Sequence, residues 1–368
     1  MLHSHAGASR GNLSRMTRSL KLLGGALACF VFLLVAGCER TESTSSSSPS
    51  PSPAPAATTA TTGEAGTQPT ESSSTGSGKK LVVGYSQIGA ESAWRTANSE
   101  SIKSEAAKRG HDLRFADAQQ KQENQIKALR SFVAQRVDVI MFSPVIETGW
   151  RQVMTDIKRA NIPVILADRR VDAPEDMYVT FIGSDFIEEG RRAGQWLADK
   201  TGGKATIAEL QGTVGSAPAN DRKKGFAEVI AKYPNMKIIK SQSGDFTRAG
   251  GKEVMQAFLN SPEGSQITAV FGHNDDMALG AIQSIKEAGK KPGKDILIVS
   301  IDGVREAFEA MVAGDLNCTV ECNPLLGPAL FDAVEKIAAG QPVPKRITPE
   351  EGVFDQSKAK EALPTRKY

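Results

Sequence analysis

The residues of this 368-residue chain that could do chemistry gather after short apolar runs. In GAESAWR, residues 89–95, Glu91, Trp94 and Arg95 bring an acid, an indole and a guanidinium within five positions, which is more chemistry than a turn requires. Other residues of these types that follow such runs are Asp168 and Arg169 in PVILADR, then Arg222, Phe246, Asn274 and Asp302.

Together these side chains suit a small ligand that is dense in hydroxyl groups. Carboxylates and amides accept hydrogen bonds, guanidinium groups donate them, and bonds with a charged partner are the strong ones. Indole and phenyl faces can pack against the C–H edges of a sugar ring. The set therefore predicts a monosaccharide-binding pocket. Two alternatives stay open: Asp168 and Arg169 could form a structural ion pair, and Trp94 could be ordinary core packing.

Enzymatic chemistry finds little support in the same residues. Asp168 and Asp302 could act as the carboxyl pair of a glycosidase, but their Arg and Asn neighbours should keep both ionised, which suits binding better. The sequence has no Gly-x-Ser-x-Gly element, and GTVGSAPAN lacks the Gly-Lys-Ser/Thr ending of a phosphate loop. HNDD, which begins at His273, has no further spaced metal ligands nearby. We therefore expect no enzyme activity, no cofactor and no metal.

The elements that must position these residues alternate between short apolar runs and longer helical patterns. Many runs are continuously apolar, which is typical of parallel strands covered on both faces by helices. About ten strands exceed one ordinary open sheet, so the sequence predicts an α/β fold of two Rossmann-like lobes. Ligands of such folds bind at the carboxyl ends of the strands. The predicted strands are LVVGYSQ, HDLRFADA, VDVIMFSP, PVILADR, YVTFIGSD, ATIAELQG, MKIIKSQSG, AVFGHND, ILIVSIDG and NCTVECNP.

The N-terminal part of the chain predicts export. Residues 1–37 combine a basic start with a short apolar run, and Val35-Ala36-Gly37-Cys38 resembles a lipobox. We expect a lipoprotein signal peptide with acylation at Cys38, although an uncleaved anchor helix and a start at Met16 instead of Met1 stay open. Residues 38–79, rich in Ser, Thr and Pro, predict a disordered tether.

Charge and cysteine content narrow the function further. Without the four positive charges of residues 1–37 the net charge changes from +3 to −1, so a nucleic-acid partner loses its main support. Cys318 and Cys322 lie on one predicted strand, where four residues span about 13 Å, too far for a disulfide. We expect two free thiols.

The residues also resemble a known family. The strings GYSQIGAESAWR, ELQGTVGS, DRKKGFAEVI, SQSGDFTR and SIDGV are similar, in order and over residues 80 to 365, to the ribose-binding, LacI-like type of periplasmic sugar-binding proteins. Within this type the galactofuranose-binding members of ABC importers look most similar. The resemblance implies type I lobes joined by a three-crossing hinge, with crossings near Gly183, Asn323 and Gly352. The implied boundaries are residues 80–183 plus 324–352 for the N-lobe and 184–323 plus 353–368 for the C-lobe.

The resemblance also implies a role for each site residue. Glu91 and Arg95 would bind ligand hydroxyls, and Trp94 would stack beneath the ring. The chain departs from the ribose-binding pattern at Cys322, where those relatives place a Gln, and at Arg95, where they place a Phe; both departures disfavour ribose. The remaining hydrogen bonds would come from Asp168, Arg169, Arg222, Asn274 and Asp302, with Phe246 on the other ring face.

The implied function is sugar capture by hinge closure, as a monomer in the periplasm or cell envelope. The partners would be a monosaccharide and an ABC permease, with the membrane reached through the lipid at Cys38. A sugar-sensing receptor for a chemotaxis protein or sensor kinase is the alternative. A repressor is disfavoured because no helix-turn-helix precedes residue 80 and an exported lipoprotein would not meet DNA.

Overall fold

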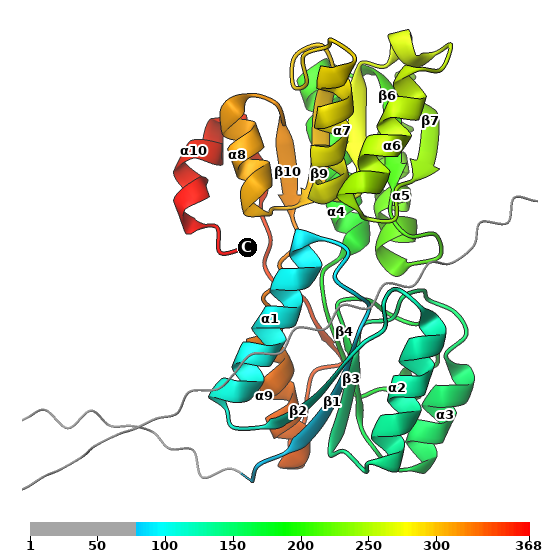
Figure 1. Cartoon of the computed structure of the whole chain (residues 1–368), viewed down its shortest axis with the longest axis vertical. Coiled ribbons are helices and arrows are strands. Elements are labelled where there is room, and N and C mark those ends of the chain that lie inside the picture. Colours follow the sequence, from blue (N-terminus) through cyan, green and yellow to red (C-terminus); the bar gives the residue numbers. More distant parts are fainter. Residues whose placement is uncertain (1–78) are drawn as a thin grey trace, which may run out of the picture. The chain divides into compact units, whose positions relative to one another are not determined.

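The computed structural model describes residues 79–368. The predicted signal peptide, the acylated Cys38 and the tether up to residue 78 lie outside the described residues. Within the described part, two parallel sheets form two α/β lobes (Figure 1).

The N-lobe contains a sheet with the strand order β11-β5-β4-β3-β1-β2, in which every neighbouring pair is parallel. One core cluster joins the sheet to α1 and α9 through Ile102 and Phe331. Another joins it to α2 and α3 through Phe132 and Met154. The strands are β1 (Val82–Gln87), β2 (Asp112–Asp117), β3 (Val139–Phe142), β4 (Val164–Ala167), β5 (Thr180–Ile182) and β11 (Arg346–Ile347). The helices are α1 (Ala93–Lys108), α2 (Gln122–Ala134), α3 (Arg151–Arg159), α9 (Gly327–Ala338) and the short η1 (Glu175–Met177).

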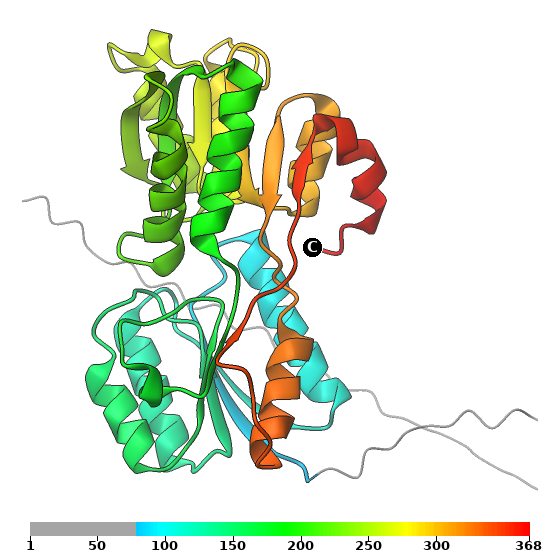
Figure 2. The ribbon, with the colours of Figure 1, turned by 180° about the vertical axis from the view of Figure 1, so that it is seen from behind.

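The C-lobe contains a sheet with the order β12-β10-β9-β8-β6-β7, parallel except where β12 meets β10. Helix α4 packs against α5 (Figure 2), and α6 packs against α7 (Figure 1). The strands are β6 (Lys204–Gln211), β7 (Asn235–Ser243), β8 (Ala269–Gly272), β9 (Leu297–Asp302), β10 (Cys318–Glu321) and β12 (Val353–Asp355). The helices are α4 (Phe186–Thr201), α5 (Ala217–Ile230), α6 (Arg248–Leu259), α7 (Asp275–Glu287), α8 (Arg305–Ala313), α10 (Gln356–Ala362), η2 (Gly264–Gln266) and η3 (Leu363–Thr365).

The chain passes between the two sheets three times. The passages run from β5 to α4, from β10 to α9, and from β11 to β12, and Figure 2 shows them side by side between the lobes. The predicted fold class of two parallel-sheet lobes with a three-crossing connection is therefore confirmed. All ten predicted strands are present as β1 to β10. The sequence missed β11 and β12, which are two and three residues long and too short to show an apolar period.

Cys318 and Cys322 are both buried and free in the structure, as predicted. Cys318 begins β10, and Cys322 follows its last residue at the start of the second passage between the sheets. The second cysteine therefore lies where the lobes meet, close to the strand ends that the sequence singled out.

Candidate functional site

A small pocket, with a cavity volume of about 20 Å³, lies between the carboxyl ends of the two sheets. A cavity of this volume has room for about one water molecule, so a larger ligand needs the two halves of the pocket to move apart. All nine residues nominated from the sequence line it, together with four that were not nominated. The lining residues are Glu91, Ser92, Trp94, Arg95, Asp168, Arg169, Phe186, Pro218, Arg222, Phe246, Asn274, Asp302 and Cys322.

Some of the four additional residues carried a sequence signal. Phe186 follows the strand end IGSD directly, and Pro218 lies in the Gly-rich segment QGTVGSAP. Both side chains are apolar, so a prediction based on hydrogen-bonding groups after strands did not include them.

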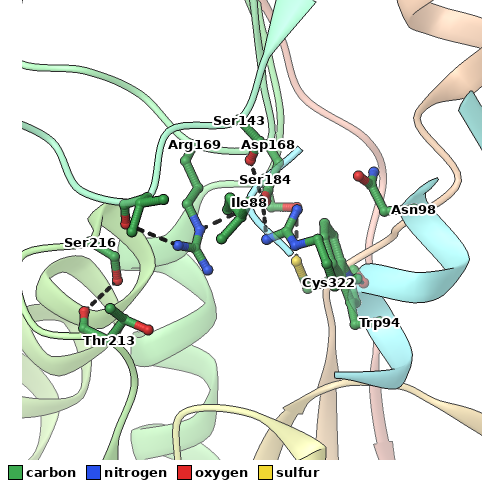
Figure 3. A network of polar contacts seen from close by, with 12 residues as sticks. Ile88, Trp94, Asn98, Ser143, Asp168, Arg169, Ser184, Thr213, Ser216 and Cys322 are labelled. Atoms are coloured by element: carbon green, nitrogen blue, oxygen red, sulfur yellow. Dashed lines mark hydrogen bonds and ion pairs between the residues drawn. The ribbon is translucent and has the colours of Figure 1, made fainter. Parts of the chain in front are cut away.

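The loop after β1 places its side chains through the start of α1. Ser92 caps this helix, because its side chain accepts a hydrogen bond from the backbone N–H of Arg95 at 3.1 Å. The cap directs the first helical turn, which carries Trp94 and Arg95, toward the C-lobe. Trp94 Nε1 donates to the backbone oxygen of Cys322 at 2.6 Å, and Figure 3 shows the two residues side by side.

Trp94 serves both as core and as pocket wall. It is 5 % exposed and belongs to the large hydrophobic cluster of the C-lobe, although its own helix is in the N-lobe. Its ring also lies 4.6 Å from the guanidinium carbon of Arg95. Trp94 therefore packs in the core, as the alternative proposed, and also lines the pocket.

Arg95 and Asp168 form the centre of a buried ionic network. Arg95 Nη2 lies 2.7 Å from Asp168 Oδ2, and Arg95 Nε lies 3.1 Å from Glu91 Oε1. Ser143 Oγ donates to the same Asp168 oxygen at 3.1 Å (Figure 3). Arg169 contributes a weaker contact, since its Nε is 3.7 Å from Asp168 Oδ2. The Asp168–Arg169 ion pair that stayed open as an alternative is thus present at 3.7 Å, but Asp168 binds Arg95 more closely.

Arg169 is held by the backbone and by an aromatic ring. Its Nη1 donates to the oxygen of Val145 at 3.2 Å, and its guanidinium carbon lies 5.2 Å from the ring centroid of Phe246 in the other lobe. Burial lowers the pKa of Arg169 to about 10, and the neighbouring Arg95 adds to this effect. The group stays charged at neutral pH.

Three buried polar atoms of the pocket residues have no hydrogen-bond partner in the described part of the chain. They are Glu91 Oε2, Arg95 Nη1 and Arg169 Nε. A buried polar group without a partner costs about 1–3 kcal/mol, and more when it is charged. One acceptor and two donors on residues that line the pocket are therefore unpaired in the described part of the chain.

On the C-lobe side, Arg222 is the central charged group. Its Nε donates to Glu189 Oε2 at 2.7 Å, its Nη1 donates to the oxygen of His273 at 2.6 Å, and its Nη2 lies 3.7 Å from Asp302 Oδ1. Its guanidinium carbon lies 5.1 Å from the Phe186 ring centroid. Arg95, Arg169 and Arg222 thus each have a carboxyl partner in the protein, so the pocket favours a neutral ligand over an anion.

The ionisation of Asp302 depends on two opposing effects. Burial raises the pKa of Asp302 well above its usual range, although Arg222 opposes the shift. Desolvation of the Asp302 carboxyl thus works against the expected ionisation more strongly than the attraction of one guanidinium supports it.

Asn274 has a structural duty in addition to lining the pocket. Its Oδ1 caps α7 by accepting from Met277 N at 3.0 Å, and its Nδ2 donates to the oxygen of Phe246 at 3.0 Å. One amide hydrogen and one oxygen lone pair remain for a ligand. The predicted contact is thus possible only for part of the side chain.

The backbone at three pocket residues is strained. Asp168, Phe246 and Asp302 have φ values of 64°, 62° and 137°, which are unusual for residues other than glycine. Gly212 permits the placement of Phe246, because a Cβ there would lie 1.9 Å from the ring. Such strain persists only where surrounding contacts hold it, and it gathers at functional sites.

The lobes contact each other around the pocket. The backbone N–H of Ala93 donates to Asp276 Oδ2 at 2.8 Å. Arg170 of the N-lobe pairs with Asp221 of the C-lobe, with 3.1 Å between Nη2 and Oδ1, and Asn220 Nδ2 donates to Glu147 Oε2 at 2.6 Å. These contacts describe a closed arrangement.

An acid pair of the buried Glu189 and the half-buried Glu351 lies beside the pocket. The side-chain atoms of Glu189, Cys322 and Glu351 that could bind a metal ion lie within 4.8 Å of one another, which is close enough to share one ion. The carboxylates already accept hydrogen bonds, Glu189 from Arg222 and Glu351 from Ser184 Oγ and from Asn323 N. The group therefore resembles a hydrogen-bonded acid pair more than an open metal site.

No helix among residues 79–368 has the length and apolar character that crossing a membrane requires.

Comparison with known proteins gives consistent matches. Residues 83–342 match the family model described as Periplasmic binding protein domain. The galactofuranose-binding protein YtfQ of Escherichia coli (strain K12) is 54% identical over 73% of this chain and 85% of its own length. The ribose import binding protein RbsB of Bacillus subtilis (strain 168) is 31% identical over 75% of this chain and 88% of its own.

Among solved structures, the binding component of an arabinose ABC transporter from Shewanella sp. ANA-3, bound to α- and β-L-arabinofuranose, is 56% identical with a TM-score of 0.76. The match covers 78% of this chain and 95% of that one. A galactofuranose-binding protein gives 52% identity and the same TM-score, with 78% and 98% covered. These relatives are sugar-binding transport proteins and not enzymes. The chain belongs to the periplasmic binding protein family, in the branch that contains the sugar import binding proteins.

Proposed function

We propose that this chain is the substrate-binding component of an ABC sugar importer that captures galactofuranose or a related aldose, in furanose form, between its lobes. The observation that carries the proposal is the pocket itself. Nine residues from the two lobes surround one small cavity, and three of their buried polar atoms lack partners in the described part of the chain.

The furanose preference rests on the relatives and on two residues. Relatives above 50% identity were solved with L-arabinofuranose and with β-D-fucofuranose, or are named for galactofuranose. Arg95 contributes a charged donor to the pocket, and Cys322 contributes a thiol, which is a weak hydrogen-bond donor. These two residues are also where the chain departs from the ribose-binding pattern.

Capture proceeds by hinge closure. In the open form the two halves of the pocket separate, and a bound sugar adds contacts to both, which stabilises the closed form. The three passages between the sheets serve as the hinge, and the permease recognises the closed surface. The lobe contacts made by Ala93 and Arg170 support closure over the ligand.

Calorimetric titration of the mature protein tests the proposal. The panel consists of D-galactose, L-arabinose, D-fucose, D-fructose and D-ribose, and we expect binding to at least one of the first three and weaker binding of ribose. Failure to bind any of the five sugars would contradict the proposal.

A sensory role is the second candidate. A fructose-binding periplasmic domain of a hybrid two-component system shares the fold at 28% identity, with a TM-score of 0.71. The pocket would serve either role equally. Sugar-dependent stimulation of ATP hydrolysis by the reconstituted permease–ATPase complex would support transport; its absence, together with sugar-dependent binding to a sensor kinase, would support sensing.

We further propose that the mature protein is a monomer held at the cell envelope by lipid on Cys38. The sequence pattern around Cys38 supports the anchor. The mass of the N-terminal peptide tests acylation, and Cys38→Ser should release the protein from the membrane fraction. Light scattering of the released form tests the oligomeric state.

A further inference from the structure

The C-lobe half of the pocket rests on one segment, the tripeptide His273–Asp275 that follows β8. The oxygen of His273 accepts from Arg222 Nη1, and Asn274 Nδ2 donates to the oxygen of Phe246. The third member, Asp275, does not line the pocket. Its side chain instead contacts the strand and loop that carry Asp302.

Asp275 accepts four hydrogen bonds, two on each oxygen. Oδ2 accepts from the backbone N–H groups of Gly303 at 2.7 Å and Val304 at 2.9 Å. Oδ1 accepts from the hydroxyls of Ser300 and Thr319, the latter at 2.8 Å. Ser300 precedes Asp302 by two positions and Gly303 follows it, so these bonds hold the chain on both sides of Asp302.

These hydrogen bonds to Asp275 matter because the backbone of Asp302 is strained. Its φ of 137° lies in a region that residues other than glycine rarely adopt, and such strain needs surrounding contacts to persist. The oxygen of Asp302 accepts from Cys322 N at 3.0 Å. The hydrogen bonds from Ser300 Oγ and from the backbone N–H groups of Gly303 and Val304 converge on Asp275, and Gly303 N also donates to Thr319 Oγ1 at 3.1 Å.

We propose that Asp275 is a positioning residue, which sets the place of the Asp302 carboxyl in the pocket without touching the ligand. The inference rests on the proposed sugar-binding function. It assigns a specific task to a buried acid that has no cationic partner among its hydrogen bonds. Burial raises the pKa of Asp275 to about 6, which shows the electrostatic cost that the four donors offset.

A double-mutant cycle with D-galactose as the probe tests the assignment. Asp275→Asn keeps the shape but leaves one oxygen to serve two pairs of donors, so we expect affinity to fall about tenfold. In an Asp302→Asn background the same change should cost less than about twofold, because the group that it positions has already been altered. Equal losses in both backgrounds would overturn the proposal.

Asn317→Ala is the matched control for general loss of stability. Asn317 is 2 % exposed, lies in the same lobe, and binds Ile298 N and the oxygen of Gly293, none of which lines the pocket. We expect it to lower the melting temperature while affinity stays within about twofold. If Asp275→Asn does not fold, Thr319→Val removes a single donor to Asp275 and should reproduce a smaller loss in the same cycle.

A crystal structure of the ligand-free Asp275→Asn protein tests positioning independently of any sugar. We expect the Asp302 carboxyl to move by about 1 Å or more, or to occupy several positions. An unmoved carboxyl would overturn the proposal even if sugar binding were lost. Failure of the wild-type protein to bind any sugar would instead count against the proposed function and leave this measurement valid.

Discussion

The two halves of the pocket differ in how their polar groups are satisfied. All three pocket atoms that lack partners belong to the N-lobe residues Glu91, Arg95 and Arg169. The C-lobe residues Arg222 and Asn274 are bound by other parts of their own lobe. The buried atoms without partners therefore lie in the N-lobe half, while Arg222 and Asn274 of the C-lobe half are held in place by the protein.

This difference implies a division of labour during closure. A rigid C-lobe wall offers a defined ring face and fixed polar groups, which limits the entropy lost when the ligand binds. The N-lobe groups gain most from the ligand, because their buried charges are otherwise incompletely paired. Changes on the two sides should therefore weaken binding by different routes.

The largest effect is expected for Asp168→Asn. The amide can adopt the left-handed backbone of Asp168, but it removes the negative charge opposite Arg95 and a charged acceptor from the pocket. Hydrogen bonds with charged groups contribute about 1.5–3 kcal/mol each, so we expect affinity to fall about 100-fold in calorimetric titration.

Asp138→Asn is the control for Asp168→Asn. Asp138 also lies in the N-lobe and accepts from the backbone of Val82 at 2.7 Å, but it does not line the pocket. Its variant should bind sugar with affinity within about twofold of wild type. If Asp168→Asn and Asp138→Asn bound sugar equally well, the N-lobe half of the pocket would not be the side that recognises the ligand.

Arg169→Lys should have the next largest effect, about tenfold in affinity. Lysine lacks the planar fork, so it cannot keep the bond to the oxygen of Val145, the stack on Phe246 and the free Nε donor together. The neighbouring Arg170→Lys is a matched comparison, because Arg170 makes two partly exposed ion pairs, one with Glu147 in its own lobe and one with Asp221 of the C-lobe. Such pairs contribute about 0–1 kcal/mol, so a change of at most about fivefold is expected there. The reverse ranking would contradict the assignment.

Gly212→Ala tests the rigidity of the C-lobe wall. The added methyl group would overlap the Phe246 ring, so the ring must move or the loop must shift. Overpacking costs about 1–3 kcal/mol of stability, and we expect a few-fold loss of affinity measured together with urea unfolding. Unchanged affinity would show that the position of Phe246 does not matter for binding.

The sequence predicted the residues that line the pocket better than the residues that support them from behind. Parallel strands place their following loops at one edge of a sheet, so searching strand ends was sufficient to find Asp168 or Asp302. Asp275 also ends a predicted strand run, AVFGHND, but its supporting role could not be told from a ligand contact, and Glu189 gave no comparable signal. A buried acid that accepts hydrogen bonds looks like any other acid in one sequence. Their roles depend on contacts with residues distant in the chain.

Contacts between the lobes were also beyond the reach of local patterns. Trp94 donates to the oxygen of a residue 228 positions away and joins the core of the opposite lobe.

The very short strands β11 and β12 complete the sheets of their own lobes by pairing with β5 and β10. Periodicity reports neighbours along the chain, so these tertiary pairings remained invisible to it.

The last expected effect concerns stability and not sugar affinity: the residues behind Arg222 should make the free energy of unfolding depend on pH. Glu351 lies on the third passage between the sheets, and it accepts from Ser184 Oγ on the first and from Asn323 N, at 2.8 Å, on the second. Burial, together with the carboxylate of Glu189, raises the pKa of Glu351 from 4.5 to about 8. The Arg222 guanidinium opposes this shift only weakly.

Between these two pKa values the folded protein keeps a proton on Glu351 that the unfolded chain releases. The free energy of unfolding should therefore fall as pH rises from about 5 to about 8. Glu351→Gln carries no titrating proton, so its stability relative to wild type should increase over this interval in urea unfolding curves. If the free energies of unfolding of the two proteins changed with pH in parallel, Glu351 would be ionised in the folded state. Glu189 and Glu351 would then both carry a negative charge beside Arg222.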